Sequence, residues 1–306
     1  MGTRLRPLTD LVPKPLMPVL NRPLLGLLLA QFEQAGFARV AVNTHHLGEM
    51  VEQFLAGQGP PGVKLSVSPE PKLLGTGGGL KQLGEILGGG PFLAVNGDIL
   101  TDLDLGAVYR SHREGALSTL VLHDCPPYNQ VWEKDGAVVS IGAPPGTLAG
   151  RPLAYTGVQV VGPEMLRYLP PAGRPADLVA TWRQALAAGA RIDALVVSGA
   201  FWQDLGAPES YLALHRRLLG GAAPSLAGFF PKLTDPFIGA GAGIAGGVQF
   251  RGGVCLAAGV EVGAGASLKN TVVWEGAVIA PEVSLEDCIV AAGVQVRASA
   301  RGRMLV

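Results

Sequence analysis

Charge and cysteine are both scarce in this sequence of 306 residues. Charged side chains make up 16% of it, and 24 Lys and Arg balance 24 Asp and Glu, which gives a formal net charge of zero. Such a chain has no general electrostatic field to attract nucleic acid or an anionic membrane, so a polyanion must be held by a local cluster of cations. We therefore expect a small ligand, with no nucleic acid and no membrane as partner.

Three cysteines, Cys125, Cys255 and Cys288, are scattered and lack the spacing of metal ligands. We expect single buried thiols in a reducing cytosol, in preference to a disulfide or a zinc site. Long apolar runs are missing too, since none approaches the ~18 residues that span a bilayer. The apolar segment 24–30 follows Pro23 and has no signal-peptide cleavage site, so it is predicted to form a buried helix in a cytoplasmic protein.

Apolar residues alternate between helical and strand spacing along the first two thirds of the chain. Segments 47–55 and 80–87 have helical spacing, whereas 63–67 alternates as a strand does. This pattern predicts an α/β fold, with a Rossmann-like, mostly parallel sheet that has helices on both faces and binds ligands beyond the carboxyl ends of its strands. Asp135-Gly136, between two apolar runs, predicts a hairpin, so part of the middle section is expected to be antiparallel.

A six-residue repeat follows a predicted connector at 222–237. Two interlocked series of apolar or small residues carry it: Ile238, Ile244, Phe250, Leu256, Val262, Leu268, Trp274 and Ala280, and Ala242, Val248, Val254, Val260, Ala266, Val272, Val278, Ser284, Val290 and Val296. Such hexads predict a left-handed parallel β-helix over 238–306, after a first domain at 1–221. A Gly/Ala-rich linker would not keep this period for so many hexads.

Histidine is absent from the predicted coils, because the last one is His215. Many hexad-repeat proteins are acyltransferases that use a histidine in the coils, so we expect this domain to be structural. Its flat faces carry few charges between residues 237 and 267. We expect them to pack on the first domain or on a second copy of the chain, which predicts a homo-oligomer formed through the β-helix.

A cluster of glycine and cations opens the chain, in Gly2-Thr3-Arg4-Leu5-Arg6-Pro7-Leu8-Thr9 and Pro13-Lys14-Pro15. Glycine lets backbone N–H groups approach a polyphosphate closely, and arginine and lysine supply lasting positive charge. The two stretches resemble the GxGTRLRPLT and PKP motifs of the sugar-1-phosphate nucleotidyltransferases. In that family a hydrophobic strand and further glycines precede the motif. Met1 stands in their place, so the first strand is expected to be missing because of a misassigned start or a truncated gene.

A second stretch, Leu74-Gly75-Thr76-Gly77-Gly78-Gly79, resembles the family's other nucleotide loop. The resemblance implies that Gly75, Thr76 and Gly77 lie against the base and ribose, and that Glu70 meets the base edge. A carboxylate only accepts hydrogen bonds, which suits the adjacent donors of guanine. Glutamate also occurs at this position in uridylyl-specific members, so both bases remain open. A flexible turn leading into the helix at 80–87 is the alternative for the glycines.

Two aspartates have the family's metal-binding contexts. Val95-Asn96-Gly97-Asp98 resembles the strand end that binds magnesium, and Trp202-Gln203-Asp204-Leu205-Gly206 resembles the later W-x-D-V-G stretch. Magnesium is usually held by one or two carboxylates together with substrate phosphate and water. The resemblance implies that Asp98 and Asp204 hold Mg²⁺, although a strand-end aspartate is often only a turn former. Asp102 and Asp104 are expected to cap the helix around Val108.

The family's sugar-contacting strand resembles Tyr155-Thr156-Gly157-Val158. The resemblance implies that Asn96, Thr156 and Gly157 bind the sugar, with Gly157 leaving room for the ring. The Glu-Lys-Pro that many members carry before this strand is absent, as it is in uridylyltransferases that act on N-acetylmuramate 1-phosphate. His45 and His46 are expected to be hydrogen-bonded elements of a strand end, not general bases.

The resemblance implies an enzyme that joins a nucleoside triphosphate to a sugar 1-phosphate and releases pyrophosphate. GTP with mannose 1-phosphate is favoured, and UTP or dTTP remain open. Arg4 is expected to hold the leaving phosphates and Lys14 the α-phosphate and incoming phosphate. The alternative is a non-catalytic regulatory subunit that binds nucleotide sugar. Retention of Arg4, Lys14, Asp98 and Asp204 opposes that alternative, and the missing strand favours it.

Overall fold

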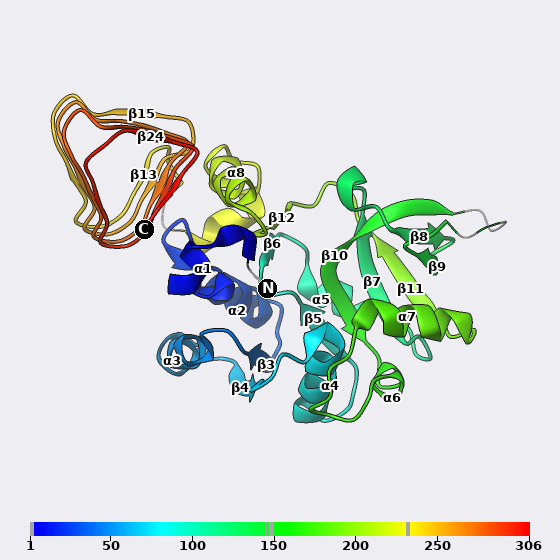
Figure 1. Ribbon diagram of the computed structural model, residues 1–306. Helices are drawn as coiled ribbons and strands as arrows, with labels where there is room; N and C mark the ends of the chain where they lie inside the picture. The colour runs from blue at the N-terminus through cyan, green and yellow to red at the C-terminus, as the bar shows by residue number, and fades with distance from the viewer. Residues whose placement is uncertain (1–2, 145, 147–149, 231–232) are drawn as a thin grey trace. The chain divides into compact units, whose positions relative to one another are not determined.

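The computed structural model describes residues 3–144, 146, 150–230 and 233–306 of the chain (Figure 1). It divides into two compact units, each assembled from separate stretches of sequence. The first unit comprises Met1–Leu28, Gly97–Asp102 and Phe201–Val306, and the second comprises Leu29–Asn96 and Leu103–Ala200. The repeat region therefore shares a unit with the opening motif, whereas the sequence-based boundaries at 221 and 238 set the two apart.

Helices form where the apolar spacing predicts them. The expected buried helix at 24–30 is α2, in which Leu24, Leu27 and Leu29 are each at most 2% exposed. The α-helices are α1 (Leu8–Leu11), α2 (Leu24–Gln34), α3 (Gly48–Gln58), α4 (Gly75–Leu87), α5 (Leu105–Arg110), α6 (Met165–Tyr168), α7 (Leu178–Ala187) and α8 (Pro208–Leu219). Short 3₁₀-helices are η1 (Thr3–Leu5), η2 (Lys14–Leu16), η3 (Pro126–Tyr128) and η4 (Pro224–Phe229). No helix in the described part of the chain is both long enough and apolar enough to cross a membrane.

The second unit contains a parallel strand pair and a six-stranded mixed sheet. The pair is β3 (Arg39–Thr44) with β4 (Lys64–Pro69). The sheet has the order β5-β10-β7-β11-β9-β8. Its strands are β5 (Phe92–Val95), β7 (Ser118–His123), β8 (Val131–Lys134), β9 (Ala137–Ile141), β10 (Arg151–Val161) and β11 (Ile192–Val196).

The mixed α/β class is as predicted, but the six-stranded sheet holds more antiparallel pairs than the sequence indicated. Only β7 and β11 pair in parallel there, because β10 runs antiparallel to β5, β7 and β8. The predicted hairpin is confirmed. Asp135 and Gly136 both have positive φ, 51° and 78°, as the two-residue turn between β8 and β9 requires. Leu80, Leu120, Leu122 and Trp182 lie in the apolar core of this unit.

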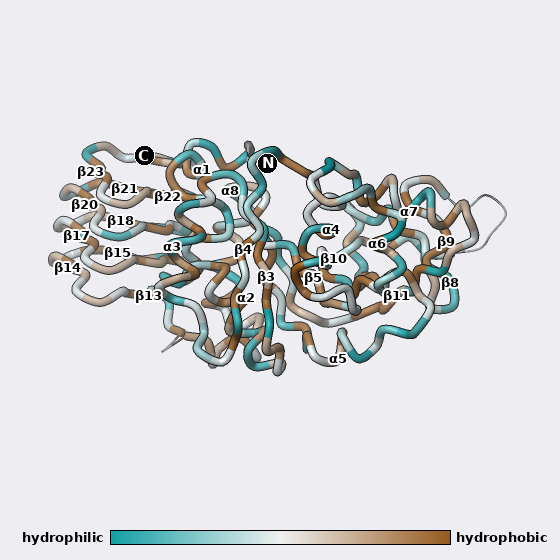
Figure 2. The backbone as a smooth tube through the Cα atoms, turned by 90° about the horizontal axis from the view of Figure 1, so that it is seen from below, coloured by the Kyte–Doolittle hydropathy of each residue, from teal (hydrophilic) through white to brown (hydrophobic). Residues whose placement is uncertain are grey.

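Three parallel sheets form the repeat region, and successive coils stack upon one another. Figure 1 shows the triangular outline of the coils and Figure 2 the stacking of β14, β17, β20 and β23. The sheets have the orders β13-β16-β19-β22-β25, β14-β17-β20-β23 and β15-β18-β21-β24. A parallel β-helix is therefore confirmed, and its left-handed turn stays a prediction. The strands are β13 (Phe237–Ile238), β14 (Gly243–Ile244), β15 (Gln249–Arg251), β16 (Cys255–Leu256), β17 (Glu261–Val262), β18 (Ser267–Lys269), β19 (Val272–Val273), β20 (Val278–Ile279), β21 (Ser284–Glu286), β22 (Ile289–Val290), β23 (Gln295–Val296), β24 (Ala300–Arg301) and β25 (Met304–Leu305).

The hexad register predicted beyond Leu268 is wrong by one residue. The corner after β15 holds two residues with positive φ, Gly252 and Gly253, whereas the corner after β18 holds Asn270 alone (φ 45°). Val273 therefore takes the interior position that Trp274 was expected to fill, and the same shift carries on into the next coil. A six-residue count along the sequence cannot detect the loss of one corner residue.

Two short strand pairs complete the first unit. A small hairpin joins β1 (Pro18–Val19) to β2 (Arg22–Pro23) through two residues with positive φ, Leu20 and Asn21. The strand β6 (Ile99–Thr101) pairs antiparallel with β12 (Trp202–Asp204). Both pairs lie next to residues of the candidate site.

Candidate functional site

The four residues expected to act on phosphate and metal all belong to the first unit. Arg4 lies in η1 and Lys14 begins η2, whereas Asp98 directly precedes β6 and Asp204 ends β12. Lys14 Nζ lies 3.1 Å from Asp98 Oδ2, and the two side chains are 18% and 37% exposed. The structure thus pairs a predicted phosphate-binding cation with a predicted metal ligand. Gly2, also expected here, lies outside the described residues, and Thr3 is the first residue of η1.

Asp98 and Asp204 come together through the β6–β12 pair. Asp204 is the register partner of Ile99, and the amide of Leu205 donates to the Asp98 carbonyl at 2.7 Å. Arg4 approaches the same loop, because a methyl group at Gly206 would overlap both the Asp204 carboxylate and the Arg4 guanidinium. The missing side chain of this glycine therefore leaves room for the side-chain ends of two site residues.

This donor set fits magnesium. Mg²⁺ takes oxygen ligands and is bound in proteins through one or two carboxylates, with phosphate and water completing its shell. The described residues include no group of three or more His, Cys, Asp or Glu that could hold a metal ion. Those residues therefore do not provide a larger set of metal ligands. Asp98 and Asp204, both partly exposed, match a metal that binds together with a phosphate substrate.

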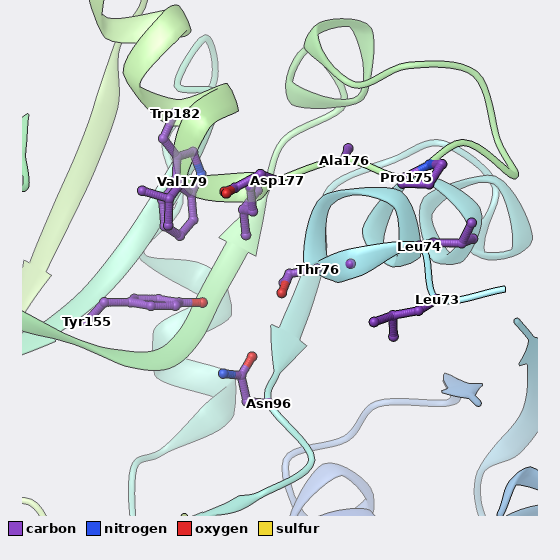
Figure 3. A pocket seen from close by; sticks show the side chains of 12 residues that line it. Leu73, Leu74, Thr76, Asn96, Tyr155, Pro175, Ala176, Asp177, Val179 and Trp182 are labelled. Atoms are coloured by element: carbon purple, nitrogen blue, oxygen red, sulfur yellow. The ribbon is translucent and has the colours of Figure 1, made fainter. Parts of the chain in front are cut away.

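A cavity of about 530 Å³ lies in the second unit, where α4, α7 and β10 contribute its walls. Figure 3 shows the side chains of Thr76, Asn96 and Tyr155 turned toward the same space. The apolar part of the lining consists of Leu73, Leu74, Pro175, Ala176, Leu178, Val179 and Trp182. Lysine and arginine are absent from the lining as far as the chain is described. The cavity therefore offers a few hydroxyl and amide groups and the Asp177 carboxylate within apolar walls.

Of the three residues predicted to bind sugar, only Asn96 lines this cavity. Thr156 is buried, and its hydroxyl donates to the Val121 carbonyl at 2.9 Å. Gly157 has φ +82° at the irregular point of β10, and a Cβ on it would lie 3.0 Å from Asn96 Nδ2. Its missing side chain thus makes room for Asn96, which differs from the expectation that it makes room for a sugar ring.

Glu70, expected at the base edge, is only 5% exposed and has partners within its own unit. Its Oε1 accepts from Asn43 Nδ2 at 3.0 Å, and its Oε2 accepts from the amide of Leu74 at 3.1 Å. The carboxylate therefore ties the end of β3 to the start of the glycine-rich stretch. This geometry supports a role for Glu70 in shaping that stretch. A preference for guanine would need a carboxylate that points outward, and the geometry of Glu70 does not provide one.

The glycine-rich stretch forms the first turn of α4, not a free loop. Gly75 and Thr76 line the cavity, whereas Gly77 donates its amide to the Ala176 carbonyl at 3.1 Å. A Cβ on Gly77 or Gly78 would come within 3.0 Å of residues 174 and 176. These glycines allow segment 174–176 to lie directly on the helix, so they shape one wall of the cavity.

Tyr155, Asp177 and Trp182 are among the cavity residues that sequence reasoning missed. Tyr155 and Trp182 meet edge to face with ring centroids 5.3 Å apart, and burial raises the pKa of Tyr155, so its hydroxyl stays protonated. Asp177 caps α7 by accepting from the Ala180 amide at 3.1 Å. Tyr155 adjoins the Thr156-Gly157 motif, which is the one signal that could have found it.

Two lesser predictions can be compared with the structure. Asp104 caps α5 through the Ala107 amide at 2.8 Å, as expected. Asp102 does not cap that helix, because its oxygens accept from the Phe201 amide and the Ser225 hydroxyl. His45 Nδ1 lies 2.8 Å from the Glu70 carbonyl, which confirms a hydrogen-bonded place at the end of β3.

Comparison with known proteins identifies the family. The model of the nucleotidyl transferase family matches residues 1–220, and the chain belongs to this family. N-acetylmuramate alpha-1-phosphate uridylyltransferase of Neisseria meningitidis is 40% identical over 169 residues, which cover 54% of this chain and 72% of that protein. Mannose-1-phosphate guanylyltransferase of Mycobacterium tuberculosis is 28% identical over 292 residues, 90% of this chain and 77% of the other. The resemblance to the sugar-1-phosphate nucleotidyltransferases, an enzyme family, is thereby confirmed.

Other comparisons agree with this assignment. UTP--glucose-1-phosphate uridylyltransferase of Synechocystis is 33% identical over 196 residues, and the match covers 58% of this chain and 50% of that protein. Among solved structures, HddC from Yersinia pseudotuberculosis superposes with a TM-score of 0.55 at 21% identity, covering 66% of this chain and 88% of its own. The structural likeness supports the fold alone.

Proposed function

We propose that the chain transfers a nucleotidyl group from a nucleoside triphosphate to a sugar 1-phosphate, giving a nucleoside-diphosphate sugar and pyrophosphate. The observation that carries this proposal is the Lys14–Asp98 ion pair at 3.1 Å, which joins two motifs that are far apart in the sequence. Family membership and the approach of the Arg4 and Asp204 side chains to Gly206 support it. The chemistry needed is charge neutralisation on phosphate oxygens, which these residue types supply.

The sugar phosphate needs no general base, because its phosphate is already an anion at neutral pH. One of its oxygens forms a bond to the α-phosphorus while the bond from that phosphorus to pyrophosphate breaks. Lys14 neutralises the α-phosphate and the incoming anion, and Arg4 holds the leaving phosphates. The absence of a histidine role agrees with His45, whose Nδ1 is engaged by a backbone carbonyl.

Magnesium is the metal that we propose for Asp98 and Asp204. When bound, it supplies charge stabilisation on the phosphate oxygens. The protein's part is to present the two carboxylates from adjacent strands and to keep Lys14 beside one of them.

The sugar is proposed to enter the cavity of the second unit and to carry an N-acyl substituent. Thr76, Asn96 and Tyr155 offer hydrogen bonds for hydroxyl groups, and Val179 and Leu73 offer exposed apolar surface for a methyl group. A lining without lysine or arginine offers no cation to offset the loss of hydration of an added anionic group near those walls. The Neisseria relative acts on N-acetylmuramate 1-phosphate by its name, which agrees with the N-acyl group, whereas the carboxylate of N-acetylmuramate has no cationic partner among the described residues of this lining.

For the nucleotide, we propose UTP in place of the GTP favoured by sequence. The preference for guanine rested on Glu70, whose two carboxylate oxygens are engaged by Asn43 and Leu74. Two of the relatives are uridylyltransferases by name, one of them at 40% identity.

A substrate panel tests these proposals. Pyrophosphate release is measured for UTP, GTP and dTTP, each with N-acetylglucosamine, N-acetylmuramate, glucose and mannose 1-phosphates. We expect UTP with an N-acetylated sugar to give the highest kcat/KM, about tenfold above glucose 1-phosphate, since an acetamido methyl in an apolar pocket contributes this order of discrimination. Fastest turnover of GTP with mannose 1-phosphate would refute the substrate assignment, and no turnover with any pair would favour a non-catalytic subunit.

A further inference from the structure

The outer surface of one β-helix face is apolar and buried. Along the β16-β19-β22 ladder the paired residues Cys255, Val272 and Ile289 are at most 2% exposed, although they do not belong to the coil core. The corresponding positions of the β17-β20-β23 face include Glu261 and Gln295, which are exposed. One face of the triangular coil is therefore covered by other residues of the first unit.

The hairpin that follows Lys14 contacts this face at Cys255 and Leu256. Asn21, in the turn of the β1–β2 hairpin, donates from Nδ2 to the Leu256 carbonyl at 2.8 Å. Its Oδ1 accepts from Cys255 Sγ at 3.4 Å. Met17, Val19 and Leu20 are at most 1% exposed. The first coils of the β-helix thus hold the tip of this hairpin.

Helix α8 holds the same hairpin from a second side and connects it to the coils. The Tyr211 hydroxyl donates to the Pro18 carbonyl and itself accepts from Trp274 Nε1 at 3.1 Å. His215 Nε2 accepts from the Leu20 amide at 3.2 Å. Tyr211 and His215 are fully buried and Trp274 is 4% exposed, so these bonds are shielded from water.

The hairpin is joined directly to the catalytic lysine. The Met17 amide donates to the Lys14 carbonyl at 3.1 Å, and the Leu24 amide donates to the Met17 carbonyl at 3.1 Å. A path of hydrogen bonds and one peptide linkage therefore runs from Trp274 in the β-helix, through Tyr211 to Pro18, and along the backbone from Pro18 to Met17 in the turn that presents Lys14.

We propose that the β-helix positions Lys14 for catalysis and that Tyr211 is the positioning residue that links them. This inference rests on the proposed function and deepens it, because it gives the repeat region a part in the reaction beyond assembly. Displacing a catalytic group by a fraction of an ångström slows a reaction that depends on in-line alignment, whereas substrate binding by other residues persists.

The test replaces Tyr211 with Phe, which keeps the ring and removes the hydroxyl between Trp274 and Pro18. We expect kcat to fall about tenfold, with the KM of both substrates within about twofold. Tyr109→Phe is the matched control, because Tyr109 likewise donates to a proline carbonyl, that of Pro91, at 3.2 Å, but in the second unit. It should leave kcat unchanged. Trp274→Phe removes the donor to Tyr211 together with part of the buried ring but leaves the bond from Tyr211 to Pro18, so it should give a smaller fall in kcat.

A double-mutant cycle separates positioning from a general loss of folded protein. In a Lys14→Ala background, Tyr211→Phe should change kcat by less than about twofold, because there is no lysine left to misplace. Equal fold-losses in both backgrounds would overturn the proposal.

A measurement that does not depend on enzymatic turnover tests the positioning role separately from the proposed function. Hydrogen–deuterium exchange of the peptide covering residues 14–24 should become faster in Tyr211→Phe and in Trp274→Phe, but not in Tyr109→Phe. Unchanged exchange in both of the first two variants would overturn the positioning role even in an active enzyme. An inactive wild-type protein would refute the proposed function, and the exchange result would still decide whether the β-helix orders the lysine turn.

Discussion

Lys14 and Asp98 are 84 residues apart in the sequence and form an ion pair, with Lys14 Nζ 3.1 Å from Asp98 Oδ2. Each was identified from its own motif, and neither motif gives any sign of the other. The pairing places a cation beside a carboxylate where polyphosphate and metal are expected to bind. It also means that a variant at one of the two positions alters the environment of the other.

Asp98→Asn and Asp204→Asn should each lower pyrophosphate release about hundredfold or more while leaving the melting temperature near that of the wild type. Both carboxylates are partly exposed, so the fold does not depend on their charge. Asp104→Asn is the control, because asparagine caps a helix as well as aspartate does and Asp104 only caps α5. Near-normal turnover by either site variant in excess magnesium would remove that residue from the mechanism.

Glu70→Gln should leave the ratio of kcat/KM for UTP and GTP unchanged. The carboxylate contacts Asn43 and the Leu74 amide, and glutamine can retain an acceptor for the latter. Lower thermal stability is expected, by about 1–3 kcal/mol, from the disturbed buried bonds. A change of more than about tenfold in the base preference, measured by pyrophosphate release, would restore Glu70 as a base-reading residue.

The free energy of unfolding should decrease as the pH falls from 6.5 to about 4. Burial lowers the pKa of His215 to about 4, against the bonds to the Tyr211 and Pro18 backbone that act in the opposite direction. In that window the unfolded chain binds a proton at His215 that the folded chain does not, which costs about 3 kcal/mol in all. His215→Gln should flatten this part of the stability profile, measured by urea unfolding, and His46→Gln at an exposed position should not.

Ile238 and Ile244 are expected to lie at the contact of a homo-oligomer. They are 46% and 38% exposed and occupy consecutive strands of the first coil. The double variant Ile238→Asp/Ile244→Asp should lower the mass measured by light scattering toward that of one chain, because charge disfavours an apolar contact. Met50→Asp, an exposed apolar position on α3, is the control. An unchanged mass in the double variant would exclude this end of the coils as the interface.

Local motifs allowed the sequence to predict part of the site. The sequence indicated four site residues, Arg4, Lys14, Asp98 and Asp204, because each lies within a short stretch that resembles a family motif. The chemistry of such a stretch can be inferred without knowing which distant residues lie beside it. The cavity residues Asp177 and Trp182 could not, because α7 has no motif and its place beside Tyr155 is fixed by packing. Glu70 was also recognised from its position in a motif. The direction of its side chain could not be predicted, because that direction depends on residues distant in the sequence.

The fold, like the site, could be predicted in part. Helical and strand spacing located α2, α3, α4 and β5 because their patterns are local. The antiparallel course of β10 follows from pairings with distant strands, which spacing does not encode. The predicted hexad register was wrong at Trp274 because of a single corner, at Asn270. The sequence therefore gave no indication that Trp274 contacts Tyr211.

The most direct test of the proposed reaction follows the oxygens of the sugar phosphate. The full chain is incubated with UTP and an N-acetylated sugar 1-phosphate whose non-bridging phosphate oxygens are ¹⁸O, and the products are weighed by mass spectrometry. Attack on the α-phosphorus predicts equal amounts of nucleotide sugar and pyrophosphate, with all of the label in the nucleotide sugar and none in pyrophosphate. Label in pyrophosphate, release of inorganic phosphate in its place, or no nucleotide sugar at all would contradict the account.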